Sequence, residues 1–208
     1  MMMNTHMMIA DYILNNFRDD RLHLINRKRF IWGNIKPDCA SRYKFKKHYY
    51  DESIDMIVGM IEKLSSLSIT EINNESSIGK FSGALGVVCH FLTDYYCLPH
   101  FQRWEFKSAM KPHIMYEREL SKVAKNYNID VIKNNRVKIN NVRYFIDETL
   151  KLYATEESYI NDLNFAYYVC SNVFNMIIES VVENERKLNE EKISSININE
   201  EDEKRIAM

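Results

Sequence analysis

Apolar residues recur along most of the chain at spacings of three and four positions, which is the periodicity of one face of an α-helix. The first such stripe consists of His6, Ile9, Ala10, Ile13 and Phe17. A second, very regular stripe consists of Ala166, Cys170, Val173, Ile177 and Val181. We expect the first helix to begin near Asn4 or Thr5, because either side chain could cap it.

The middle of the chain predicts further helices with recognisable ends. One stripe runs through Ile54, Ile57, Met60, Ile61 and Leu64, and another helix is expected over about Ser77–Tyr96. Pro112 suits the first turn of a following helix, and two more helices are expected between 141 and 188. The segment Trp32–Asp38 reads as a loop around Pro37.

Composition supports an all-α fold and one domain. The 208 residues include only five Gly and three Pro, which is too few turn-forming residues for an all-β protein. The length suits one well-packed domain and is short for two. We therefore predict a compact multi-helix domain over 1–188. Residues 189–208 lose the apolar periodicity, and we expect a polar, disordered tail there.

Net charge and hydropathy limit the kinds of partner and the cellular location that we expect for this chain. The formal net charge of −1 argues against a general polyanion binder, so no specific nucleic-acid partner is expected. No run of eighteen uncharged apolar residues exists, so no transmembrane segment is expected. The start lacks the features of a secretory signal, which predicts a cytoplasmic protein as written, or a secreted one if a leader has been removed. The four cysteines read as reduced thiols with packing roles.

One motif stands out within the apolar run 83–98. His90 and Asp94 lie four residues apart, so they share one face of the predicted helix. Burying such a pair costs several kcal/mol unless something compensates it, and metal ions are the usual compensation. The same spacing recurs at His113 and Glu117, with His100 between the two pairs. Although a lone histidine on an apolar face is usually a core residue, this repetition predicts a polynuclear metal site. Gly83 and Gly86 on the same side would let another backbone approach it.

The order of these residues resembles the zinc-dependent phospholipase C family, which is related to the single-strand-specific zinc nucleases. The matching pieces are Asn4-Thr-His6, Gly33-Asn-Ile-Lys-Pro-Asp38, Lys47-His48-Tyr, His90-Phe-Leu-Thr-Asp94 through Pro99-His100, and His113-x3-Glu117. They cover roughly residues 4 to 117. In two places the chain departs from the family pattern: Pro99 directly precedes His100, and the chain begins with Met where secreted members begin with Trp.

The resemblance implies a ligand set for zinc. Two zinc ions are expected, one held by Asp38, His48, His90 and Asp94, and one held by His100, His113 and Glu117. A third would be shared by His6, Asp94 and the amino terminus of the chain, which makes Asp94 a bridging carboxylate.

The resemblance also implies hydrolysis of a phosphodiester, most simply cleavage of a phospholipid to diacylglycerol and a phosphorylated headgroup. Metal-activated water would attack, with Asp38 as the residue that orients it or accepts its proton. Glu117 in place of Asp favours the phospholipase branch. Tyr49, Trp104 and Phe106 are candidate substrate contacts, with peripheral membrane contact as a further expectation, or they simply pack the helices. A single-strand nuclease-like enzyme and a degenerate, metal-stabilised lipid-binding protein remain as alternatives.

Overall fold

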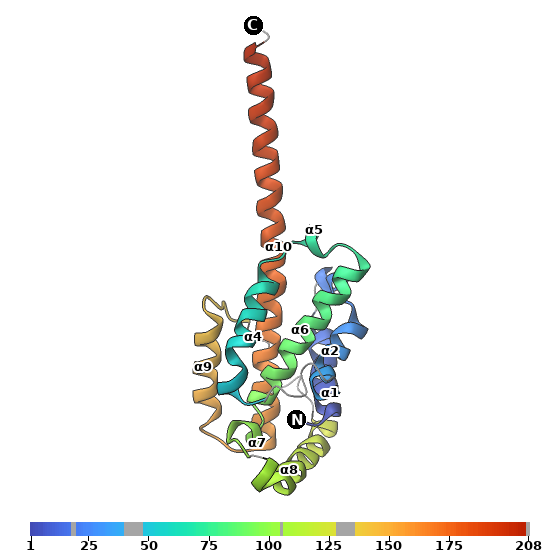
Figure 1. Ribbon diagram of the computed structural model, residues 1–208, viewed down its shortest axis with the longest axis vertical. Helices are drawn as coiled ribbons and strands as arrows, with labels where there is room; N and C mark the ends of the chain where they lie inside the picture. The colour runs from blue at the N-terminus through green and yellow to red at the C-terminus, as the bar shows by residue number, and fades with distance from the viewer. Residues whose placement is uncertain (18–19, 40–47, 105, 128–135, 207–208) are drawn as a thin grey trace.

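The computed structural model describes residues 1–17, 20–39, 48–104, 106–127 and 136–206, with side chains at 106–108 and 195–206 left out. Within these ranges the secondary structure is helical and contains no strand, which confirms the predicted all-α, single-domain fold (Figure 1). The elements are α1 (Met3–Asn16), the 3-10 helix η1 (Asp20–Leu24), α2 (Arg27–Cys39), α4 (Tyr50–Ser65), α5 (Ile69–Ile72), α6 (Glu75–Tyr95), α7 (Leu98–Phe101), α8 (Phe106–Asn126), α9 (Val142–Tyr153) and α10 (Tyr159–Ile206).

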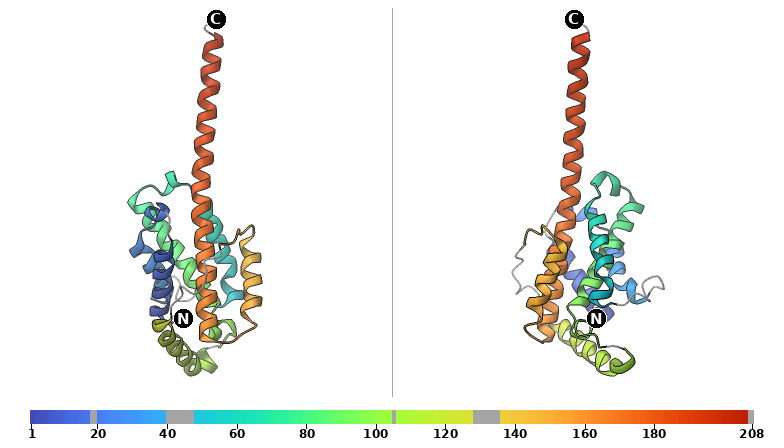
Figure 2. Two further views of the ribbon diagram at one scale, coloured as in Figure 1. Left: turned by 180° about the vertical axis from the view of Figure 1, so that it is seen from behind. Right: turned by 60° about the vertical axis from the view of Figure 1, so that its left-hand side comes forward.

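Helix α6 is the central element of the fold. Its N-cap Asn74 accepts a hydrogen bond from the backbone N–H of Ser77 at 2.9 Å, which satisfies one of the free donors of the first turn. From Leu85 to Tyr95 the side chains are buried, because α1, α2, α4 and α10 all pack against this helix (Figure 2). Polar groups on α6 are therefore enclosed by other helices.

Helices α2 and α6 cross at unusually close range. A Cβ on Gly33 would lie 2.9 Å from the Cα of Gly86, and a Cβ on Gly86 would lie 2.8 Å from the Cα of Gly33. Real Cβ atoms are essentially never found so close, so both positions require glycine. This finding confirms the expectation that a second backbone approaches α6 here. Gly83 is less restricted, because its Cβ would lie 3.8 Å from the Arg29 carbonyl oxygen.

Two local predictions were wrong. The segment Trp32–Asp38 is part of helix α2, with Pro37 inside its last turn. A proline so close to a helix end removes a single backbone hydrogen bond, and packing of α2 on α6 compensates for it. Helix α1 begins at Met3, near the expected position, but neither Asn4 nor Thr5 caps it: the N-cap is Met2, which supplies no side-chain cap, and Thr5 is buried inside the first turn. Burial of the amino-terminal residues thus decides where α1 begins.

Other boundaries agree with the sequence pattern. Helix α8 breaks at Ala109, which has φ −133° and ψ 24°, and Pro112 lies in the first turn after this break as predicted. Helix α4 covers the stripe from Ile54 to Leu64. The stripe of α10, from Ala166 to Val181, is fully buried.

Helix α10 is long, and its second half leaves the body of the molecule (Figures 1 and 2). The backbone of 189–206 continues this helix rather than forming an irregular segment, while the expected division into a domain and a disordered tail stays a prediction. The stretch Tyr159–Ser194 is long and apolar enough to span a membrane, although no span was expected. Because 61% of its apolar window is buried within the protein, core packing accounts for this hydropathy.

Candidate metal centre

All eight side chains singled out as metal ligands converge at one place in the fold. They come from α1 (His6), the end of α2 (Asp38), the segment just before the N-cap of α4 (His48), α6 (His90, Asp94), α7 (His100) and α8 (His113, Glu117). These elements lie far apart in sequence. The ring nitrogens and carboxylate oxygens of the eight side chains nevertheless meet near the C-terminal end of α6, where His90 and Asp94 lie. The family resemblance implied this set of residues, and their binding of metal stays a prediction.

Asp94 lies in the middle of the cluster. Its Oδ2 is 2.9 Å from His48 Nδ1 and 3.4 Å from His90 Nε2. Its Oδ1 is 3.3 Å from His6 Nε2 and 3.8 Å from His100 Nε2. A carboxylate whose two oxygens face different imidazoles can bridge two cations, which agrees with the bridging position that the resemblance implied.

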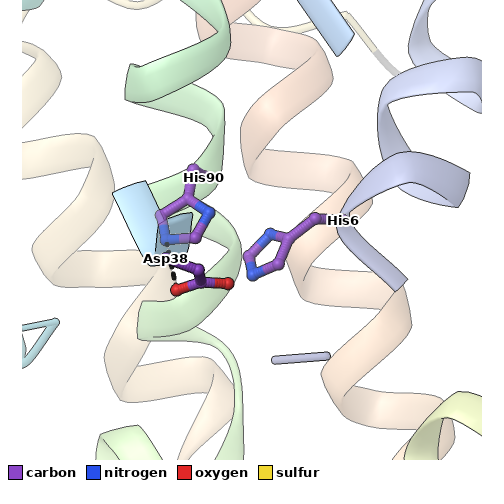
Figure 3. Close-up of side chains that lie close together, drawn as sticks. All are labelled: His6, Asp38 and His90. Atoms are coloured by element: carbon purple, nitrogen blue, oxygen red, sulfur yellow. Dashed lines mark ion pairs between the residues drawn. The ribbon is translucent and has the colours of Figure 1, made fainter. Parts of the chain in front are cut away.

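Asp38 faces the same side of this cluster. One of its oxygens lies 3.6 Å from His90 Nε2 and 3.7 Å from His48 Nδ1. Figure 3 shows the Asp38 carboxylate between the rings of His90 and His6. Asp38 was expected on a loop but belongs to the last turn of α2, and its side chain is 33% exposed while His90 is fully buried. It is therefore a ligand-type group near the solvent side of the cluster.

A second group forms around Glu117. Its Oε1 lies 3.0 Å from His113 Nε2, four residues away on α8, and 3.1 Å from His100 Nε2 on α7. The His113 Nδ1–H donates to the backbone carbonyl of Trp104 at 3.1 Å. That hydrogen bond leaves Nε2 as the nitrogen available to a metal ion.

The His90 ring is likewise held by a hydrogen bond from Nδ1 to a backbone carbonyl. The carbonyl belongs to Asn34, which the sequence did not identify as a site residue. The His90 Nδ1–H donates to the backbone carbonyl of Asn34 at 2.7 Å. Asn34 itself is fully buried and follows Gly33, so the close crossing of α2 and α6 brings this carbonyl to the imidazole. The glycines of the helix crossing were the sequence signal that could have identified it.

The amino group of Met1 also lies within the cluster. It is buried and pairs closely with Asp94 Oδ1, while Glu117 Oε1 is 3.2 Å away and His100 Nε2 is 3.4 Å away. Burial would lower the pKa of this amine, but the charges of Asp94 and Glu117 outweigh burial and raise it well above its ordinary value. The amine therefore occupies the place beside His6 and Asp94 that the resemblance implied.

Electrostatics favours the protonation states that metal binding needs at His90, His100 and Asp94. Burial lowers the pKa of His90 and of His100, so both imidazoles are neutral. Burial would raise the pKa of Asp94, but its electrostatic interactions with the His100 ring, the amino terminus and the His6 ring hold this pKa well below its usual range. The pKa of Asp38 is raised by burial and by the nearby charge of Asp94.

The donor set fits zinc. Both ring nitrogens of the buried His6 and the Nδ1 of His100 make no hydrogen bond within the described residues. Leaving such groups unpaired costs on the order of 1–3 kcal/mol each. Imidazole nitrogens and carboxylate oxygens at this density are the ligands that Zn²⁺ takes. A metal ion beside Asp94 would satisfy His6 Nε2, the ring nitrogen that faces this carboxylate.

The candidate substrate contacts differ in their placement. Tyr49 is buried, with its ring centroid 6.2 Å from that of His100 and the Arg103 guanidinium 5.0 Å above its ring. Trp104 is half-buried, and its indole Nε1–H donates to Gln102 at 3.0 Å. Its backbone carbonyl also holds His113, as described above. The side chain of Phe106 lies outside the described residues.

Comparison with known proteins identifies the family. The zinc-dependent phospholipase C family model matches residues 5–160, well over half of the chain. No significant match was found among curated proteins or among solved structures. The matched region begins beside His6 and contains all eight ligand-type side chains of the cluster. By this match, the chain belongs to the zinc-dependent phospholipase C family.

Proposed function

We propose that this protein is a zinc-dependent phosphodiester hydrolase that cleaves a phospholipid to diacylglycerol and a phosphorylated headgroup. The observation that carries the proposal is the position of Asp94, whose two oxygens face imidazoles from three other elements. Family membership supports the same reaction class. The eight ligand-type residues are assigned to zinc as before: Asp38, His48, His90 and Asp94 to one ion, His100, His113 and Glu117 to a second, and His6 with the bridging Asp94 to a third, for which the amino terminus would first have to lose its proton.

The buried side chains of the cluster would surround these ions, and three of them are already in the protonation state that zinc binding needs. When bound, zinc polarises phosphoryl oxygens and lowers the pKa of coordinated water. The described residues around the cluster keep His90 and His100 neutral and Asp94 ionised, so no proton has to leave these side chains first. The hydrogen bonds from His90 to Asn34 and from His113 to Trp104 hold both rings in position.

Asp38 is the residue best placed to take part in the chemistry. Its carboxylate is one-third exposed, whereas Asp94 is 1% exposed, so water and substrate can reach it. Burial and the charge of Asp94 raise its pKa, and a more basic carboxylate accepts a proton more readily from attacking water. We assign to Asp38 the orientation of the water and acceptance of its proton, in addition to ligation.

Substrate contacts are proposed for the aromatic residues between the ligands. Trp104 and Tyr49 are near His113 and His100, where a headgroup would enter, and Phe106 follows them in sequence. Exposed methionines on the ligand-bearing helices α1 and α8 could contact a lipid surface at the same time; these are Met3, Met7, Met110 and Met115. Peripheral membrane contact is therefore part of the proposal.

The test is phosphocholine release from a soluble phosphorylcholine ester by chelator-stripped protein, with and without added zinc. Zinc-restored turnover supports the proposal. We expect Asp38→Asn to lose on the order of 100-fold or more in turnover, while Asp55→Asn, a change at an exposed carboxylate of α4, keeps full activity. Zinc binding with cleavage of single-stranded nucleic acid instead would favour the nuclease alternative. Zinc binding without either activity would favour a degenerate, metal-stabilised member.

A further inference from the structure

The second metal group contains a side chain that the family pattern does not supply. Cys97 offers its sulfur within 4.8 Å of ligand atoms of His100 and Glu117. The thiol is fully buried, and no hydrogen bond to its sulfur occurs among the described residues. The apolar run that contains Cys97 predicts only a packing role for this residue. Its place in the fold is different from that of an ordinary core thiol.

The backbone holds Cys97 between two ligands. It is the N-cap of α7, and its N–H donates to the Asp94 carbonyl at 3.1 Å. Its own carbonyl accepts the N–H of His100 at 2.9 Å. The extended conformation at the cap, with φ −123° and ψ 120°, interrupts the helical path between α6 and α7. The side chain is therefore fixed at the junction from which Asp94 and His100 enter the cluster.

The other three cysteines of the chain have different surroundings. Cys170 donates to the Cys89 carbonyl at 3.3 Å and lies 3.4 Å from the Thr93 hydroxyl, so these two cysteines join α6 to α10. Cys39 is exposed and follows Asp38. Within the described part of the chain, Cys97 is the cysteine that accompanies histidine and carboxylate donors in a buried group.

We propose that Cys97 is a fourth protein ligand of the zinc held by His100, His113 and Glu117, an inference that rests on the proposed zinc site. Binding would release the thiol proton to water and leave a thiolate–zinc bond. The ligand set then becomes one sulfur, two nitrogens and one carboxylate oxygen. Four protein ligands are typical of closed, structural zinc sites, whereas catalytic sites keep one position open. This ion would thus fasten α8 to α7 and to the junction between α6 and α7, and the group containing the exposed Asp38 would carry the chemistry.

The test is zinc K-edge X-ray absorption on the zinc-loaded full chain. A thiolate ligand produces a scattering shell at about 2.3 Å, distinct from nitrogen and oxygen at about 2.0–2.1 Å. We expect this sulfur shell in the wild type and in Cys39→Ser, and its loss in Cys97→Ser. We also expect Cys97→Ser to release one zinc equivalent to a chelator at least about tenfold more readily.

The outcomes separate this inference from the proposed function. Bound zinc without a sulfur shell in the wild type, or a shell that persists in Cys97→Ser, overturns the Cys97 inference alone. A chain that binds no zinc overturns both. If Cys97→Ser does not fold, the single variants Cys39→Ser, Cys89→Ser and Cys170→Ser decide the question. The chain has four cysteines, so a shell that survives in all three variants leaves Cys97 as its source.

Discussion

Gly33 of α2 and Gly86 of α6 are in backbone contact, since a Cβ on Gly33 would lie 2.9 Å from the Cα of Gly86. Asn34, the next residue of α2, connects this contact to the cluster of ligand-type side chains. The contact brings the Asn34 carbonyl to 2.7 Å from His90 Nδ1 and places Asp38 one helical turn later, beside His90 Nε2. The helix crossing therefore sets the orientation of a central imidazole.

Substituting either glycine should push the two helices apart. We expect Gly33→Ala to reduce the free energy of unfolding by about 2–3 kcal/mol, as overpacking of a tight contact typically does. Gly59→Ala on α4 is the matched control, because its Cβ would meet nothing within 4 Å. That change should stabilise the protein by about 0.5–1 kcal/mol, since alanine favours the helix. Chemical denaturation of both variants measures the difference, and equal effects would refute the packing argument.

Loss of a central imidazole should release metal. We expect His90→Ala to lower bound zinc by at least one equivalent per chain and to lower the thermal midpoint by several degrees, because metal binding is coupled to folding. His23→Ala is the control, since His23 is exposed on η1 and lies outside the cluster. Elemental analysis with thermal unfolding tests this. Full zinc content together with an unchanged midpoint in His90→Ala would mean that the cluster does not hold metal.

Acid should release zinc only below the ordinary histidine range. Burial lowers the pKa of His90 and His100, so protons compete for these nitrogens at a lower pH than the usual value near 6.5. The carboxyl pKa of Asp94 is lowered as well, so it stays ionised over the same range. Zinc content after equilibration from pH 7.5 downwards should stay constant to about pH 6.5 and fall below it. A release midpoint above that value would contradict the assignment.

Asp162 predicts a pH effect outside the metal cluster. It accepts hydrogen bonds from Tyr153 Oη at 2.7 Å, Tyr116 Oη at 3.1 Å and the Leu98 N–H at 3.2 Å, yet burial raises its pKa to about 6. Because the folded-state pKa is above the unfolded value near 3.9, the folded protein binds the proton more tightly. The contribution of Asp162 to stability is therefore present below about pH 4 and is lost as pH rises to about 6.

This loss should be on the order of 3 kcal/mol, since the folded and unfolded pKa values differ by about two units and each unit corresponds to about 1.4 kcal/mol. Denaturation of wild type and Asp162→Asn between pH 4 and pH 7 measures it, because the variant lacks the titrating group. We expect the stability difference between the two proteins to change with pH over this interval. A parallel pair of stability curves would show that Asp162 titrates normally.

The recognition of the site from sequence depended on local spacing. His90 with Asp94, and His113 with Glu117, are each four residues apart, so helical geometry alone places each pair on one face. The apolar stripe of α10 is equally local, and it identified a buried helix correctly. Residues whose role depends on long-range contacts are harder to find from sequence. Asn34 orients His90 through its backbone carbonyl, and the side chain of Asn34 gives no sign of this role.

Sequence by itself determined that the chain folds into helices and that histidines and carboxylates of a metal-binding type occur in pairs on those helices. These properties follow from the 3.6-residue repeat and need no knowledge of distant segments. Tertiary structure decided that the segment around Pro37 is helical, that Met1 reaches Asp94, and that Cys97 lies with His100 and Glu117. Each of these depends on how separate helices pack, and packing energy outweighs the small local preferences that a sequence pattern records.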